Sequence, residues 1–92
     1  MARPRCKYKT GPCPKALCYR PEGGSTKHDD EIELNLEEIE ALRLKDIKGM
    51  DQTSAAEKMG ISQSSFQRVL NTARKKVSVA LFEGKIIRIK SI

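Results

Sequence analysis

The twenty residues QTSAAEKMGISQSSFQRVLN, numbered 52–71, decide how this chain folds. Their apolar side chains recur at the spacing expected of two short helices that pack around a turn. The positions expected between the two helices hold Ala55, Met59, Ile61, Phe66 and Val69. Ala56 is small enough to let the helices cross closely, and Gly60 stands where the turn needs a positive φ. The stretch therefore predicts a helix-turn-helix; a plain helical bundle without a DNA role is the alternative.

The sequence before this stretch predicts a first helix. Asn35 is a favoured N-cap, and Glu38 stands three residues later, as in a capping box. Leu34 and Ile39 occupy the two positions of a hydrophobic staple around that cap. The apolar face of this helix is made of Leu36, Ile39, Leu42 and Ile47. The pattern ends at a glycine, so we expect the first helix to run from the Asn35 cap to Gly49.

Two further helices follow the same logic. Asp51 is placed to cap a second helix over 52–59. Ser62 is placed to cap a third helix, which ends at Gly84. This third helix has one continuous apolar stripe, made of Phe66, Val69, Leu70, Ala73, Val77, Ala80 and Leu81. The stripe, with Phe82 beside it, extends past the surface that the first two helices can cover. A C-terminal strand, the N-terminal segment or a second subunit must bury the excess, and we expect a twofold homodimer.

The remaining segments predict short strands and an irregular arm. Residues 31–34 alternate charged and apolar side chains, and 86–89 are rich in isoleucine, so each is typical of a short strand. The two segments are candidates to pair in a small two-stranded sheet. Residues 1–28 hold all four prolines and indicate a basic, irregular arm. The predicted fold class is mainly α: a three-helix helix-turn-helix domain over 29–92, with the motif at 52–71.

Charge is distributed in three blocks, which indicates the kind of partner. Residues 1–28 contain seven Lys and Arg against one acid, and 52–92 contain eight against two. Between them, 29–51 contain nine acids against three basic residues. Blocks of this kind favour a polyanionic partner, most often nucleic acid, although a solvated charged surface is the plain alternative.

Length and composition exclude other classes. A chain of 92 residues buries too little surface for a large enclosed active site. No apolar run approaches the roughly 18 residues of a membrane span, and no signal peptide is visible at the N-terminus, so we expect a cytoplasmic protein that binds no membrane. No small-molecule substrate is indicated. A cysteine nucleophile needs a base, and the single histidine lies in the same loose segment, so we expect no enzyme.

If the motif binds DNA, its geometry assigns roles to individual residues. The second helix of the motif enters the major groove with its N-terminal residues on base edges. The exposed residues there are Gln63, Ser64, Gln67 and Arg68. Glutamine can bond bidentately to adenine, and arginine to guanine. Gln52 and Thr53 begin the preceding helix and are expected to hold a phosphate. Arg74 and Lys75 are expected to contact the DNA backbone or to form a solvated helix face.

The arm adds two further sets of candidate residues. Arg3 and Arg5 fit an extended cationic arm in an A·T-rich minor groove, or a basic tail that only raises nonspecific affinity. The four candidate zinc ligands are Cys6, Cys13, Cys18 and His28. They have the ligand number of a tetrahedral site but lack the C-x2-C spacing of most structural sites. We therefore expect free thiols and no cofactor, with zinc as the alternative.

Beyond these patterns, the chain resembles a family of small prokaryotic proteins predicted to bind DNA through a helix-turn-helix like the fourth region of sigma factors. The matching segments are Arg3-Pro4-Arg5, Tyr19-Arg20-Pro21, 34–44, 55–62, 66–77 and Gly84-Lys85. The resemblance implies a bacterial or archaeal transcriptional regulator without catalysis. Residues 7–17 depart from the family's more apolar stretch, so nothing is carried over to the arm.

Three functions follow, in different classes. The leading one is sequence-specific binding of double-stranded DNA, with the recognition helix starting at Ser62. The second is a protein–protein adaptor, in which the acidic residues 29–51 dock on a basic partner within the transcription machinery. The third is a thiol or zinc sensor built on the cysteines of the arm. Salt dependence of DNA binding separates the first from the second, because each neutralised phosphate releases counterions.

Overall fold

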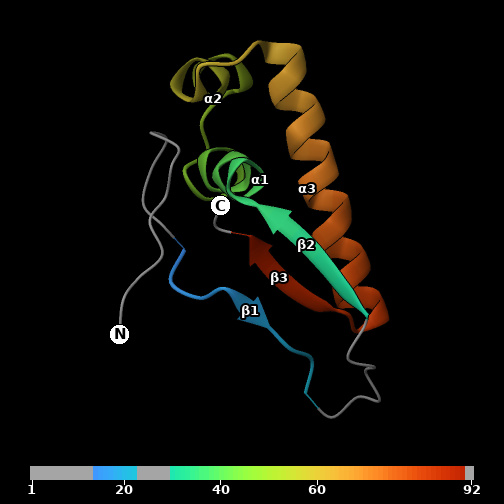
Figure 1. The fold of residues 1–92 in the computed structure, drawn as a ribbon. Coiled ribbons are helices and arrows are strands. Elements are labelled where there is room, and N and C mark those ends of the chain that lie inside the picture. The colour runs from blue at the N-terminus through green and yellow to red at the C-terminus, as the bar shows by residue number, and fades with distance from the viewer. Residues whose placement is uncertain (1–13, 23–29, 91–92) are drawn as a thin grey trace.

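A computed structural model describes residues 14–22 and 30–90 of the chain. Within them the fold is mainly helical, with a small sheet, as predicted. The helical elements are α1 (Leu36–Leu42), η1 (Arg43–Ile47), α2 (Gln52–Met59) and α3 (Gln63–Glu83), and the strands are β1 (Cys18–Tyr19), β2 (Glu31–Asn35) and β3 (Ile86–Lys90). Figure 1 shows α3 running along one side of the molecule, with α2 at its N-terminal end and the sheet at its C-terminal end.

The predicted helix boundaries follow from local caps. Asn35 and Glu38 form the expected capping box, in which each side chain bonds the other's backbone N–H. Asp51 and Ser62 cap α2 and α3 by accepting from the backbone N–H three residues on. Gly60 ends α2 with a φ of 72°, a conformation that costs an L-residue with a side chain about 1–2 kcal/mol.

The first helix differs from its prediction in its second half. The chain from Arg43 to Ile47 forms a π-helix, in which Lys48 N–H donates to the Arg43 carbonyl five residues back at 2.9 Å. The wider turn changes which side chains face the core: Leu44 is fully buried, whereas Ile47 is 79% exposed. The periodic pattern assumed a uniform α-helix and therefore placed Ile47 inward, which is wrong.

The sheet contains three strands in the order β1-β3-β2, rather than two. The predicted pairing of 31–34 with 86–89 is confirmed and is parallel, with Leu34 opposite Ile89. Since parallel neighbours need a long crossover, all the helices lie between β2 and β3 in the chain. The third strand comes from the segment expected to form the arm: Cys18 and Tyr19 pair antiparallel with β3, and the Leu17 carbonyl accepts from Ile89 N–H.

One core cluster joins the helices. Its buried members are Ala41, Leu44, Ala55, Ala56, Phe66 and Leu70. Met59, Ile61 and Val69 pack against it, so all five positions expected between the helices of the motif are confirmed. Ala73, Ala80, Ile86 and Ile89 are buried toward the sheet. None of the described helices combines the length and the apolar character needed to cross a membrane.

Candidate nucleic-acid interface

The N-terminal turns of α2 and α3 lie against each other and share hydrogen bonds. Gln52 donates from Nε2 to the backbone oxygen of Gln63 at 3.3 Å and to Oε1 of Gln67 at 3.4 Å. Next to it, the Thr53 hydroxyl oxygen accepts from Nε2 of Gln63. We call Gln52, Thr53, Gln63 and Gln67 the amide cluster. Their side chains link two helices that the core cluster already holds together.

Buried side chains beneath the amide cluster fix how α2 meets α3. Phe66 and Ala55 are fully buried, and Ala56 is nearly so. Small residues on α2 leave room for the ring of Phe66 in the core cluster. Ile61 N–H donates to the Ala56 carbonyl at 3.0 Å, which closes the turn. The amide cluster therefore stands on a packed base.

Two further predicted reader residues lie on the same end of α3. Ser64 is exposed, and its hydroxyl lies 3.3 Å from that of the capping Ser62. Arg68 is exposed and forms no ion pair with the residues that the structure describes. The structure thus brings together six of the sequence-predicted site residues, namely Gln52, Thr53, Gln63, Ser64, Gln67 and Arg68.

Arg74 and Lys75 follow further along α3 and differ from each other. Arg74 donates from Nε to Oδ2 of Asp46 at 3.2 Å and from Nη2 to the other carboxylate oxygen. This hydrogen bond lowers the pKa of Asp46 and raises that of Arg74 from their ordinary values. A phosphate would have to compete with Asp46 for Arg74. Lys75 is exposed and open to such a contact.

Four of the nine acids between residues 29 and 51 form ion pairs with basic residues. The four ion pairs are Glu31–Arg88, Glu38–Lys76, Glu40–Arg43 and Asp46–Arg74. Glu38 and Glu40 are also buried. Asp51 is used as the cap of α2, and its hydrogen bonds with Ser54 lower its pKa. Half of the eight described carboxylates of the block are therefore engaged in ion pairs, and Asp30, Glu33 and Glu37 lie outside these contacts.

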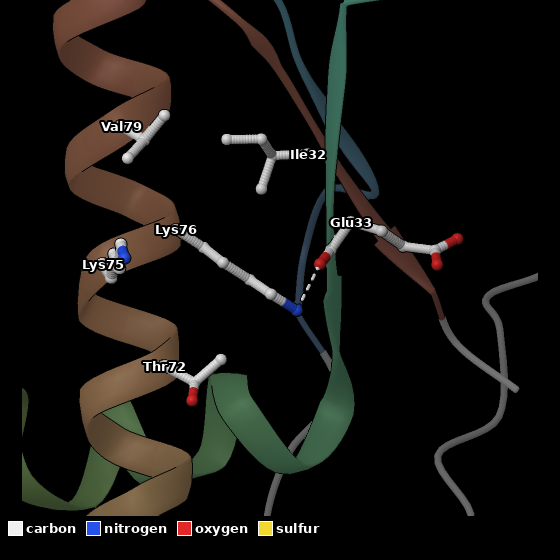
Figure 2. Close-up of a pocket in the computed structure, with 6 residues that line it drawn as sticks. All are labelled: Ile32, Glu33, Thr72, Lys75, Lys76 and Val79. Atoms are coloured by element: carbon white, nitrogen blue, oxygen red, sulfur yellow. Dashed lines mark hydrogen bonds between the residues drawn. The ribbon is translucent and has the colours of Figure 1, made fainter.

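A groove of about 490 Å³ lies between α3 and β2 (Figure 2). Ile32 and Val79 form its apolar walls, and Thr72 and Lys75 line it on the side of α3. The ammonium of Lys76 crosses the groove to the Glu33 carbonyl at 2.9 Å, as the dashed line in Figure 2 shows. This contact occupies a backbone acceptor of β2, so that acceptor is not free to pair with a strand of another chain.

The apolar stripe of α3 is covered only in part. The sheet end buries Ala80 and leaves Val77 half-buried, but Leu81 is 75% exposed and Phe82 is 91% exposed. Tyr19 and Ile47 are the other large exposed apolar side chains among the described residues. The C-terminal strand is thus one cover of the stripe, and Leu81 and Phe82 remain outside it.

Several predicted candidates lie outside the described residues: Arg3, Arg5, Cys6, Cys13 and His28. Cys18, the fourth candidate zinc ligand, is described as a half-buried free thiol on β1. The described part of the chain contains no group of three or more His, Cys, Asp or Glu side chains that could hold a metal ion.

Sequence reasoning missed how the site residues support one another. Gln52 and Thr53 were expected to hold a phosphate, yet their side chains bond to α3, ten to fifteen residues away. The pairing of Arg74 with Asp46 spans 28 residues. No periodic pattern reports such contacts. The one available signal was that three amides and a hydroxyl of the cluster fall within the first two turns of the two helices of the motif.

Comparison with known proteins places the chain in a family. The family model described as "Protein of unknown function DUF134" matches residues 1–91. A UPF0251 protein of Clostridium acetobutylicum is 44% identical over 97% of this chain and 62% of its own length, and one of Halothermothrix orenii is 42% identical over 96% and 65%. The chain thus spans less than two thirds of these relatives. No solved structure matches it. The chain belongs to the DUF134 family of small prokaryotic proteins, whose bacterial members include UPF0251 proteins.

Proposed function

We propose that this protein binds double-stranded DNA in a sequence-specific manner and acts as a transcriptional regulator. The observation that supports this best is the exposed end of α2 and α3, where the amide cluster, Ser64 and Arg68 form one polar surface. Amides, hydroxyls and arginine are the groups that read base edges in the major groove. The resemblance of the motif to the fourth region of sigma factors agrees with this use.

In this proposal the first two turns of α3 enter the major groove. Gln63, Ser64, Gln67 and Arg68 then face base edges, as in other helix-turn-helix proteins. Lys75 lies about two turns from Arg68 on the same helix and contacts the phosphate backbone. The chain's net charge of +6 supplies the long-range attraction to a polyanion.

The charge distribution favours DNA over an acidic docking surface. Four acids of the block are held by Arg88, Lys76, Arg43 and Arg74. A basic protein partner would have to displace these cations, two of which pair with the buried carboxylates of Glu38 and Glu40. No carboxylate in the described part of the chain pairs with the exposed Arg68 or Lys75.

The test measures binding to duplex DNA as a function of salt, after selection of a cognate site from random sequences. We expect affinity to fall steeply between 50 and 200 mM salt. Arg68→Ala should lose about 1–3 kcal/mol at the selected site and relax specificity at one base pair, whereas Lys75→Ala should weaken all sequences alike and reduce the salt slope by about one. Binding that is insensitive to salt, or unchanged base preference in Arg68→Ala, would contradict the proposal.

We also propose that the DNA-bound form is a homodimer. A single motif reads few base pairs, and about 10⁶ or more competing sites exist in a genome. Leu81 and Phe82 are the exposed apolar residues of α3 that a second copy could cover. Sedimentation at micromolar concentration should give a dimer for the wild type and a monomer for Leu81→Asp. A monomeric wild-type mass would contradict this arrangement.

A further inference from the structure

We infer that Gln52 is a positioning residue: from α2 it holds the side-chain amide of Gln67 in the orientation that reads adenine. The inference rests on the proposed function and adds to it the chemistry of one base contact. In the amide cluster, the hydrogen bonds between α2 and α3 leave each glutamine a defined set of free donors and acceptors.

The Nε2 of Gln52 uses both of its N–H donors. One goes to the Gln63 backbone oxygen and the other to Oε1 of Gln67. Turning the Gln67 amide by 180° would place its own N–H donors against the Nε2 of Gln52, which is oriented by its bond to the Gln63 backbone oxygen, an atom that can only accept. The Gln67 oxygen therefore points toward α2, and its orientation is set by a residue on the neighbouring helix.

This orientation leaves Gln67 with a specific pair of groups. Both N–H donors of its Nε2 stay available, and so does one lone pair of Oε1. Adenine presents the N7 acceptor beside the N6 amino donor, which matches this pair. Guanine presents two acceptors, N7 and O6, so O6 would face the Gln67 oxygen. The amide held by Gln52 thus favours adenine over guanine.

A second bond of the cluster holds Gln63, whose Nε2 donates to the hydroxyl oxygen of Thr53. Because a hydroxyl can donate as well as accept, this bond positions Gln63 without fixing which end of its amide faces α2. Neighbouring residues of α2 therefore contact two reader amides of α3, and Gln52 sets the orientation of one of them, Gln67. Because Phe66 and Ala55 beneath them are fully buried, α2 and α3 cannot shift freely relative to each other. Side chains ordered before binding lose less conformational entropy when the complex forms.

The experiment selects preferred sites from randomised duplexes with the wild type, Gln52→Ala and Gln52→Glu. We expect adenine at one position for the wild type. Gln52→Ala frees the Gln67 amide, and Gln52→Glu offers it an acceptor that turns Nε2 toward α2, so the adenine-over-guanine ratio should fall about 10-fold in both. Lys58→Gln is the control, because this exposed residue of α2 lies outside the cluster and the change lowers the net charge by one, as Gln52→Glu does.

A modified base then tests the contact directly. In 7-deazaadenine the N7 acceptor is replaced by a C–H group, so the wild type should bind the substituted site about 5-fold more weakly. Gln52→Ala and Gln67→Ala should respond less than about 2-fold. If Gln52 had only a structural role, Gln52→Ala would lower the melting temperature of the protein and would lose as much affinity for the 7-deazaadenine site as the wild type does.

The outcomes separate the two proposals. The role of Gln52 would be overturned if Gln52→Ala kept the base preference of the wild type and its sensitivity to 7-deazaadenine. It would also be overturned if the site selected by the wild type contained no preferred adenine. Both results leave DNA binding intact. A wild type that binds no duplex at any salt concentration would overturn the proposed function, and this inference with it.

Discussion

The two ends of α3 rest on different supports and leave different chemistry exposed. At its N-terminal end, α3 packs against α2 through Phe66 and presents amides and hydroxyls to solvent. At its C-terminal end, α3 packs against the sheet, and the side chains left outside are Leu81 and Phe82. We call these the α2 end and the sheet end. Under the proposed function, one helix would serve DNA recognition at one end and assembly at the other.

The largest expected effect is the difference in stability between alanine substitutions at the two phenylalanines of the chain. Phe66 at the α2 end is fully buried, and Phe82 at the sheet end is 91% exposed. Phe66→Ala should lower the free energy of unfolding by about 3–5 kcal/mol, because it empties the space between α2 and α3. Phe82→Ala, the matched control, should change it by less than about 0.5 kcal/mol. Urea denaturation measures both, and similar losses would refute the contrast in packing.

The next largest effect is expected for a buried carboxylate, Glu38, in comparison with an exposed amide at the α2 end. Glu38 is 6% exposed, bonds Asn35 in the capping box, and accepts from Lys76 Nζ at 3.0 Å. Glu38→Ala should cost about 2–4 kcal/mol, because it removes a cap and leaves Lys76 without its carboxylate. Gln52→Ala at the α2 end should cost less than about 0.5 kcal/mol, since its bonds are exposed.

A control for this comparison is available one residue away. Glu37→Ala removes an acid from the same helical turn without touching the capping box or Lys76. Its cost should stay near 0.5 kcal/mol or below. Equal losses for Glu37→Ala and Glu38→Ala in denaturation experiments would show that the loss of helix-terminal charge, rather than the buried ion pair, explains the result.

Smaller still is the effect of the glycines that end α2 and α3. Gly60 has a φ of 72° and Gly84 a φ of 70°, and a Cβ at either position would meet nothing within 4 Å. Alanine at each should therefore cost only the left-handed backbone conformation, about 1–2 kcal/mol, and the two losses should be equal. Thermal melting compares them. In DNA binding only Gly60→Ala should have an effect, because Gly60 sets the turn beside the readers.

The smallest effect concerns the exposed pair Arg74–Asp46. Arg74→Ala should cost less than about 1 kcal/mol, as exposed ion pairs do. The folded pKa of Asp46 lies below its ordinary value of 3.8, so the contribution of the pair is fully present above 3.8 and is lost as the pH falls through the lower, folded pKa. The difference between wild type and Arg74→Ala should thus vanish on acidification. A difference that does not shrink as the pH falls below 3.8 would indicate another role for Arg74.

Local sequence patterns predicted much of the fold and part of the candidate site. The caps Asn35, Asp51 and Ser62 were correctly placed, because each acts on a backbone N–H only three residues away. The core positions of the motif followed from helical periodicity. The exposed reader residues are the helix positions that fall outside the apolar stripe, so the sequence also identified Ser64 and Arg68 as exposed.

Other features depend on contacts between distant segments. The cross-helix bonds of Gln52 and the pairing of Arg74 with Asp46 join residues whose distance in the sequence carries no periodic signal. The strand at Cys18–Tyr19 forms because β3 offers an open edge, and nothing in a two-residue segment of an apparently irregular arm indicates that. The π-helical turn after Leu42 depends on how Leu44 enters the core.

The sequence by itself therefore determined where the helices start, the turn at Gly60 and the core positions of the motif, because caps and periodicity act within a few residues. Only the tertiary structure decided the π-helical turn, the order and parallel pairing of the strands, the pairing of four acids in the acidic block and the orientation of the amides between α2 and α3. These depend on which surfaces meet when the chain closes on itself, and charges and amides choose partners by distance in space.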